Sequence, residues 1–204
     1  MSYWSDPKPV RRTRAVTVDD VAREAVVLLD EGGIPAVTIR SLAGRVGVAA
    51  PSLYSRIRSV DDILDLGLDH ALDGDRQVWR AAETGSPHEL LLALYDHLCR
   101  HRWAAQVIGL RAPRGPAYLR FSERLLILLL GQGVEDPLSA AYAMSNFVIG
   151  SATTAASATD EPKSPVDHSL APTYSRLHAG HAVDPRTIVD AGLRALTSAV
   201  TGRT

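Results

Sequence analysis

Hydrophobic residues recur three or four positions apart along most of the chain, which is the spacing of a helix face. The first such run has end signals on both sides. Thr17 is a good N-cap with Asp20 in the first turn, and Gly32-Gly33 favours a helix end. We therefore predict a first helix whose apolar face consists of Val18, Val21, Ala22, Ala25, Val26 and Leu29.

Two short segments follow and predict a pair of small helices. One spans about Ile39 to Arg45 behind a Thr38 N-cap, and Gly47 ends it. The other begins near Ala50, with Pro51 acceptable in a first turn, and reaches about Arg56. The apolar positions that would pack this pair against the first helix are Ile39, Leu42, Val46, Val48 and Leu53.

The rest of the chain continues the helical pattern. Ser59 caps a fourth helix, and later helices are predicted over Pro87 to Trp103, Ala117 to Leu130, Pro137 to Ala158 and Asp184-Pro185 to about Val200.

Two segments interrupt this pattern: Arg111 to Pro116 is irregular, and residues 159–174 are rich in proline and polar residues. We expect the second segment to be a loop or a mobile segment. No alternating strand pattern and no internal repeat is present, so the predicted fold class is all-α. It comprises an N-terminal three-helix helix-turn-helix domain at residues 1–60 and a larger helical domain at residues 61–204.

Composition excludes several other classes of protein. Of 204 residues, 46% are apolar and 22% are charged, unlike a disordered, collagenous or disulfide-stapled chain. Cys99 is the one cysteine, so an intrachain disulfide is impossible and a reducing compartment is expected. The longest strongly apolar run, Leu125 to Leu130, is far shorter than the about 20 residues of a membrane span. The N-terminus also lacks the apolar core of a secretory signal, so we expect a cytoplasmic protein with no membrane contact.

The formal net charge of −1 hides an uneven distribution. Residues 1–60 hold nine Lys/Arg and six Asp/Glu, a net charge of +3, whereas residues 61–204 hold 13 and 17, a net charge of −4. Such asymmetry is a hint of an anion-binding module in the N-terminal part. A chance imbalance of this size is also common, so the charge alone does not decide.

The segment from Thr38 to Arg56 has the features of a helix-turn-helix. In this motif the first helix braces the second, which enters the major groove of DNA. Gly47 allows the sharp turn, and Ala49, Ala50 and Ser52 supply short side chains where the second helix would meet DNA. An ordinary helical hairpin is the alternative interpretation.

Two longer stretches resemble the TetR family of transcriptional repressors. Its N-terminal domain is similar to residues 26–64, VVLLDEGGIPAVTIRSLAGRVGVAAPSLYSRIRSVDDIL. The C-terminal domain of the tetracycline-repressor branch is similar to residues 101–150, which contain an R-x-P element, a Q-G before a helix, and N-F-x-x-G. The resemblance covers most of the chain and is more secure in the first half.

The resemblance implies DNA-contact roles for individual residues. Thr38 would cap the second helix and contact a phosphate, or only cap it, and Arg40 would read a base. The Tyr54 hydroxyl would bind a phosphate. The full predicted DNA-binding set is Thr38, Arg40, Ala50, Pro51, Ser52, Tyr54, Arg56 and Arg58.

This sequence departs from the family pattern at Val60, where family members carry a phosphate-binding lysine. Arg56 and Arg58 could replace that contact. A basic arm at residues 1–16, with Arg11, Arg12 and Arg14, could bind phosphates or the minor groove, or it could be a solvated run of charge.

The second domain has two predicted tasks. The Pro137 to Ala158 helix has a face of small residues and the final helix has an apolar face, which favour a homodimer through a four-helix bundle, as the resemblance implies. The alternative is that both faces belong to the core of a monomer. Aromatic and polar side chains in otherwise apolar helices also favour a pocket for a small-molecule effector, although each could be a core residue. The predicted pocket residues are Trp79, His101, Trp103, Tyr118, Phe121, Tyr142, Asn146 and Phe147, with His97 as a further candidate.

No metal or other cofactor is expected. Tetracycline repressors hold a divalent metal with a histidine shortly before the R-x-P element, and Ile108 stands at that position here. His97 and His101 are four residues apart, but two histidines without a carboxylate are a weak metal signal.

Local motifs of enzymes are absent, since the chain has no H-E-x-x-H, no G-x-S-x-G and no phosphate-binding loop. The resemblance therefore implies a homodimeric repressor that binds a palindromic double-stranded DNA operator and releases it when a small apolar effector binds. The alternative is a helical small-molecule-binding or scaffold protein whose helix-turn-helix is vestigial.

Overall fold

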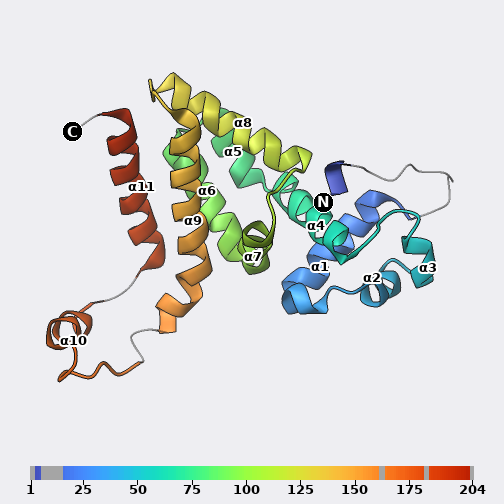
Figure 1. Cartoon of the computed structure of the whole chain (residues 1–204), viewed down its shortest axis with the longest axis horizontal. Coiled ribbons are helices and arrows are strands. Elements are labelled where there is room, and N and C mark those ends of the chain that lie inside the picture. Colours follow the sequence, from blue (N-terminus) through green and yellow to red (C-terminus); the bar gives the residue numbers. More distant parts are fainter. Residues whose placement is uncertain (1–2, 6–15, 161–163, 182–183, 203–204) are drawn as a thin grey trace.

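The computed structural model describes residues 3–5, 16–160, 164–181 and 184–202, and this part of the chain is helical with no strand (Figure 1). A short 3-10 turn, η1 (Tyr3–Ser5), precedes the α-helices. These are α1 (Val18–Ala36), α2 (Ile39–Arg45), α3 (Ala50–Leu53), α4 (Val60–Asp73), α5 (Arg76–Thr84), α6 (Pro87–Arg100), α7 (Arg102–Leu110), α8 (Pro116–Gly131), α9 (Pro137–Asp160), α10 (Pro172–His178) and α11 (Pro185–Thr201). The predicted all-α class is confirmed.

The helix ends set by local hydrogen bonds agree well with the sequence. Thr17 and Asp20 form a reciprocal capping box at α1, and Thr38 and Ser41 form another at α2. Asp184 caps α11, as the Asp184-Pro185 pair predicts. At the other end of α1, Gly33 leaves the helical conformation with φ +66°, although one further turn continues to Ala36.

The α3 helix is shorter than predicted. It ends at Leu53, and residues 54–56 form a turn in which the amides of Arg56 and Ile57 both donate to the carbonyl of Leu53. The turn brings the fully buried Ile57 into the core beside Leu53. Tertiary burial of Ile57 therefore ends the helix before Arg56.

Three other features differ from the prediction. The helix expected over Pro87 to Trp103 is two helices, because the backbone bends at His101. The α5 helix was missed because it is short and mainly polar, with only Val78 and Ala82 buried. Residues 159–174 were expected to be a loop, but α9 extends to Asp160 and α10 begins at Pro172.

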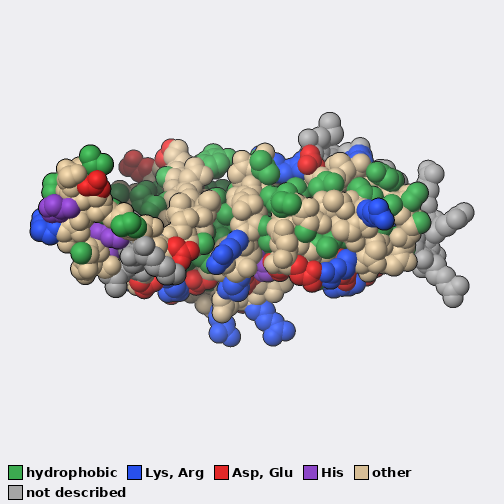
Figure 2. Space-filling view, turned by 90° about the horizontal axis from the view of Figure 1, so that it is seen from below, with side chains coloured by type: hydrophobic (Ala, Val, Ile, Leu, Met, Phe, Trp, Pro, Cys, Tyr) green, Lys and Arg blue, Asp and Glu red, His purple; other side chains and the backbone are tan. Residues whose placement is uncertain are grey.

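The helices form an elongated molecule (Figure 1). The α1–α3 unit lies at one end, α4 connects it to the central α5–α9 group, and α11 packs beside α9 and α6. The short α10 projects beyond the ends of α9 and α11, and Figure 2 shows hydrophobic and histidine side chains gathered at that end. None of the described helices is both long enough and apolar enough to span a bilayer.

Candidate nucleic-acid interface and effector cavity

The α2–α3 pair forms a helix-turn-helix in which α3 is shorter than predicted. Gly47 takes φ +71°, a left-handed conformation that glycine adopts without strain, and this turns the chain between the two helices. The Val48 amide donates to the Ala43 carbonyl at 3.0 Å across this turn. Leu42 and Leu53 are fully buried, so the pair is fixed to the core shared with α1.

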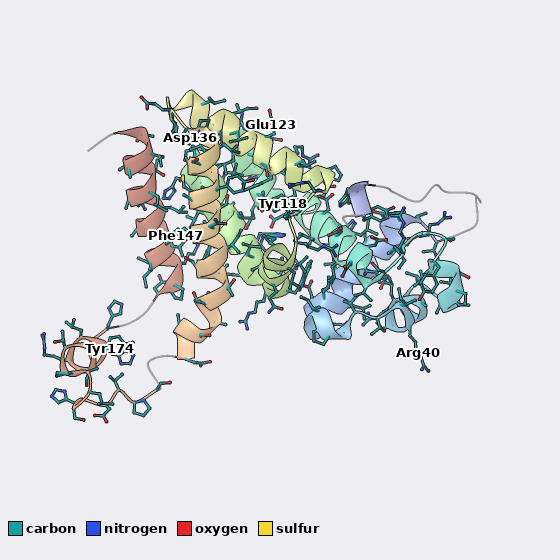
Figure 3. The ribbon with its side chains drawn as sticks, viewed as in Figure 1. Arg40, Tyr118, Glu123, Asp136, Phe147 and Tyr174 are labelled. Carbon is teal, nitrogen blue, oxygen red and sulfur yellow. The ribbon has the colours of Figure 1, made fainter. Side chains whose placement is uncertain are left out.

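The outer surface of this pair carries most of the predicted DNA-binding residues. Residues 38–58 form a basic strip with four arginines and no Asp or Glu, in which Arg45 is paired with Glu31 of α1. In Figure 3, Arg40 extends from α2 away from the rest of the molecule. Such a strip suits contact with phosphates. The exposed members of the predicted set are Thr38, Arg40, Pro51, Ser52, Tyr54 and Arg58, and Ala50 is half-buried.

Arg56 is placed differently from the rest of the predicted set. Its side chain is 3% exposed, and its Nε donates to the Val16 carbonyl at 2.9 Å. The guanidinium therefore faces inward and fixes the chain just before α1, which leaves Arg58 as the neighbouring exposed cation. The basic arm with Arg11, Arg12 and Arg14 lies outside the described residues.

A cavity of about 340 Å³ lies between α8, α9 and the segment that joins α7 to α8. Four of the predicted pocket residues line it: Tyr118, Phe121, Tyr142 and Asn146. The Tyr118 and Phe121 rings lie 6.1 Å apart. Burial and the neighbouring Tyr142 raise the pKa of Tyr118 to about 12, so its hydroxyl is neutral at physiological pH.

The other four predicted pocket residues lie elsewhere. The indole N–H of Trp79 donates to the carbonyls of Leu72 and Asp73, and the ring is covered by the Arg120 guanidinium at 3.8 Å. Phe147 lies on the side of α9 that faces α11 (Figure 3), where a Cβ at Gly192 would overlap its ring.

His101 and Trp103 lie at the joint between α6 and α7. His101 Nδ1 lies 2.8 Å from Asp30 Oδ1, and the Trp103 indole N–H donates to the same oxygen at 2.7 Å. Both side chains therefore face α1 and not the cavity. A bond to α1 also explains the bend at His101, because a continuous helix would direct these two side chains along different faces.

Sequence reasoning missed several cavity residues. Arg114, Ser122 and Ser145 line the cavity, as does Ile108. The signal that could have found Arg114 is its place in the irregular segment directly before the helix of Tyr118 and Phe121. Ser122 and Ser145 are small polar residues, which the aromatic pattern of the sequence does not indicate.

A row of aspartates on α4 holds the segment next to the cavity. Asp61 and Asp65 both lie near the Arg111 guanidinium, at 3.3 and 3.2 Å. Asp69 Oδ1 accepts the Tyr118 amide at 3.0 Å, at the start of α8. Asp73 pairs with Arg120 at 2.7 Å. These residues are four positions apart and share one face of α4, so the helix that leads to the DNA-binding unit is tied to the cavity wall.

Other polar clusters in the larger domain serve packing. His97 is buried, and its Nδ1 lies 2.8 Å from Asp75 Oδ2, an oxygen that also accepts from Arg100. Among the described residues, no group of three or more His, Cys, Asp or Glu side chains is placed to hold a metal ion.

Known proteins with similar sequences are transcriptional regulators, and the matching family model describes a repressor domain. Residues 76–180 match the family model described as "Tetracyclin repressor-like, C-terminal domain". An HTH-type transcriptional regulator of Saccharopolyspora erythraea is 36% identical over 160 residues, which are 74% of this chain and 66% of that protein. The HTH-type transcriptional repressor DrrR1 of Streptomyces coeruleorubidus is 32% identical over 155 residues, 72% of this chain and 54% of that protein. The aligned region thus spans between about half and two thirds of these curated relatives.

A solved structure shows the same fold. The Streptomyces coelicolor TetR family protein ActR, in complex with actinorhodin, superposes with a TM-score of 0.71 over 92% of this chain and 98% of that one, at 24% identity.

Proposed function

Because this chain belongs to the TetR family of transcriptional regulators, we propose that it is a ligand-responsive repressor that binds a palindromic DNA operator as a homodimer. The family consists of transcriptional regulators, which are not enzymes. The observation that carries the proposal is the set of exposed residues, Arg40 and Arg58 among them, on a fixed helix-turn-helix whose segment 38–58 contains no Asp or Glu. We also propose that the protein acts in the cytoplasm, where its operator would be.

The face proposed for the homodimer is formed by α9 and α11. Residues 138–159 contain no charged side chain, although α9 runs along the surface. An exposed helix face without charged side chains is typical of a surface that packs against another protein. The exposed members of this face are Ser139, Ala143, Gly150, Thr153 and Ser157 on α9, and Ile188, Ala191, Ala195, Ser198 and Ala199 on α11.

The proposed effector site is the cavity between α8 and α9. It is lined mainly by apolar and aromatic side chains, which suits a small apolar molecule. ActR in complex with actinorhodin gives a protein of this fold with a bound small molecule, which supports a small-molecule effector. The α4 aspartate row supports α4 as the route by which binding would change the spacing of the two DNA-binding units.

A second candidate function is a small-molecule-binding or scaffold protein with a vestigial helix-turn-helix. It is favoured by two positions: Val60 replaces the family lysine, and Arg56 is buried, so neither reaches a phosphate. Binding to DNA separates the two candidates, because a scaffold would show no specific complex.

The test is a mobility shift with the full chain and the DNA directly upstream of its own gene, across a series of salt concentrations. We expect a specific complex whose affinity falls steeply with salt, since phosphate contacts release counterions. Arg40→Ala should weaken specific binding by about 1–3 kcal/mol. Tyr54→Phe should weaken all DNA binding by a smaller and sequence-independent amount.

The matched control is Arg80→Ala, which removes an exposed arginine from α5, outside the helix-turn-helix. It should leave the shift unchanged. If the wild-type chain forms no specific complex at low salt, or if Arg40→Ala and Arg80→Ala behave alike, the repressor proposal fails and the scaffold alternative becomes the better one.

A further inference from the structure

We propose that the cavity between α8 and α9 selects an aromatic anion: a flat, largely apolar molecule that carries one acidic group bound by Arg114. This inference rests on the proposed function, because it names the chemical class of the effector for the same cavity. It comes from the balance of charge and shape among the lining residues.

The residues that line the cavity carry only positive charge. Arg114 is the only charged residue among those that line the cavity, and no Asp or Glu is present there. The guanidinium makes a hydrogen bond to the neighbouring Pro113 carbonyl at 2.9 Å, and its side chain is exposed at the rim. Because a guanidinium has several donors in a fork, one backbone carbonyl leaves others available for a carboxylate, sulfonate or phenolate.

The shape of the cavity favours a ring system. Phe121 is buried at the inner wall, and Tyr118 lies beside it. Tyr142 stands at the opening with 63% of its surface exposed, together with the exposed Leu119 and Leu138. Aromatic walls on α8 and α9 bind flat rings by stacking and edge contacts.

The remaining polar groups are neutral. The Tyr118 hydroxyl lines the cavity and can donate a hydrogen bond to an oxygen of the ligand. Asn146 and Ser145 add amide and hydroxyl groups on α9. A cationic ligand would find no countercharge among these residues and would face Arg114, so the site discriminates against amines.

Two fluorescent probes test this assignment because they share one ring framework. Anilinonaphthalene sulfonate carries a sulfonate, and N-phenyl-naphthylamine lacks it. Both gain fluorescence in apolar sites, and each is titrated against the full-length wild-type chain, Arg114→Gln and Arg80→Gln. Arg80 is the matched control, since it is exposed on α5 and lies outside the cavity.

We expect Arg114→Gln to lower the affinity for the sulfonate probe by about tenfold and to leave the affinity for the neutral probe unchanged. The reason is that only the anion loses a charge-assisted hydrogen bond. Arg80→Gln should change neither affinity. Ser145→Trp, which fills the cavity, should abolish binding of both probes and so locate them.

Three results would overturn the inference. One is an equal effect of Arg114→Gln on both probes, or none on either. The second is binding that survives Ser145→Trp unchanged, which places the probes elsewhere. The third is no binding of either probe. None of these results depends on DNA, so a failure here is distinct from a failure of the operator-binding experiment.

Discussion

At the residue scale, Arg40 and Arg56 show how one residue type takes two roles. Both lie in the basic strip and both were predicted to contact DNA. Arg40 is exposed on α2, whereas Arg56 is buried and donates to the Val16 carbonyl. A buried guanidinium needs a hydrogen-bond acceptor, and the backbone before α1 supplies one. The role of Arg56 is therefore structural in this fold, and Arg58 is the exposed arginine beside it.

His97 makes the stability of the fold depend on pH. Burial lowers the pKa of His97, although the hydrogen bond to Asp75 opposes the shift. The pKa of a histidine in an unfolded chain is about 6.5, which is above the lowered pKa of His97 in the folded protein. The unfolded state therefore binds more protons than the folded state as the pH falls through this range. The free energy of unfolding should therefore decrease as the pH falls through this range.

The measurement is urea unfolding of wild type and His97→Gln at pH values of about 7.5 and 5.5, on either side of the histidine range. We expect the difference between the two pH values to shrink in His97→Gln. The exposed His181→Gln should keep the wild-type difference. A pH dependence that is equal in all three proteins would contradict the role given to His97.

At the element scale, the contact between α4 and the start of α8 depends on a glycine. Asp69 accepts the amides of Ala117 and Tyr118, which have no partner within their own helix because they lie in its first turn. The Asp69 carboxylate reaches them only because Gly115 has no side chain, since a Cβ there would overlap it. The residue at position 115 thus sets how closely α4 and α8 approach.

Gly115→Ala should destabilise the protein by about 1–3 kcal/mol, because the carboxylate must move and leave buried amides unpaired. Thermal or urea unfolding measures the loss. Gly109→Ala is the matched control: this glycine lies within α7 and a Cβ there would meet no neighbour. That control should be neutral or stabilising by about 0.5–1 kcal/mol. Equal effects of the two substitutions would rule out the α4–α8 contact as the cause.

At the scale of the whole molecule, the uncharged face of α9 and α11 determines the proposed assembly. Ala195→Arg places a charge at the centre of the exposed side of α11. Burying an unpaired charge in an interface is costly, so we expect a monomer in sedimentation with unchanged helicity by circular dichroism. Specific operator binding should fall with it, because a palindrome needs two linked binding units.

Thr84→Arg serves as the control, since Thr84 is exposed at the end of α5, away from this face. It should keep the mass and DNA affinity of the wild type. A wild-type chain that is monomeric at all concentrations tested would refute the homodimer.

Most helix starts can be predicted from local sequence. Helix spacing and capping involve residues within about four positions of one another, so Thr17, Thr38 and Asp184 could be assigned from their neighbours alone. The family motifs in residues 26–64 are also local, and they predict the helix-turn-helix, although Arg56 of the predicted DNA-binding set is buried.

Contacts between side chains far apart in the sequence depend on how the helices pack. The bend at His101 accompanies its contact with Asp30, 71 positions earlier. On α4, Asp69 accepts the amide of Tyr118, 49 positions later. The cavity likewise unites Arg114 with Tyr142, and it excludes the equally aromatic Trp79 and Phe147. Residue type cannot distinguish the aromatic residues that line the cavity from those outside it, because both kinds lie on amphipathic helices. Their environment depends on which helix faces pack together.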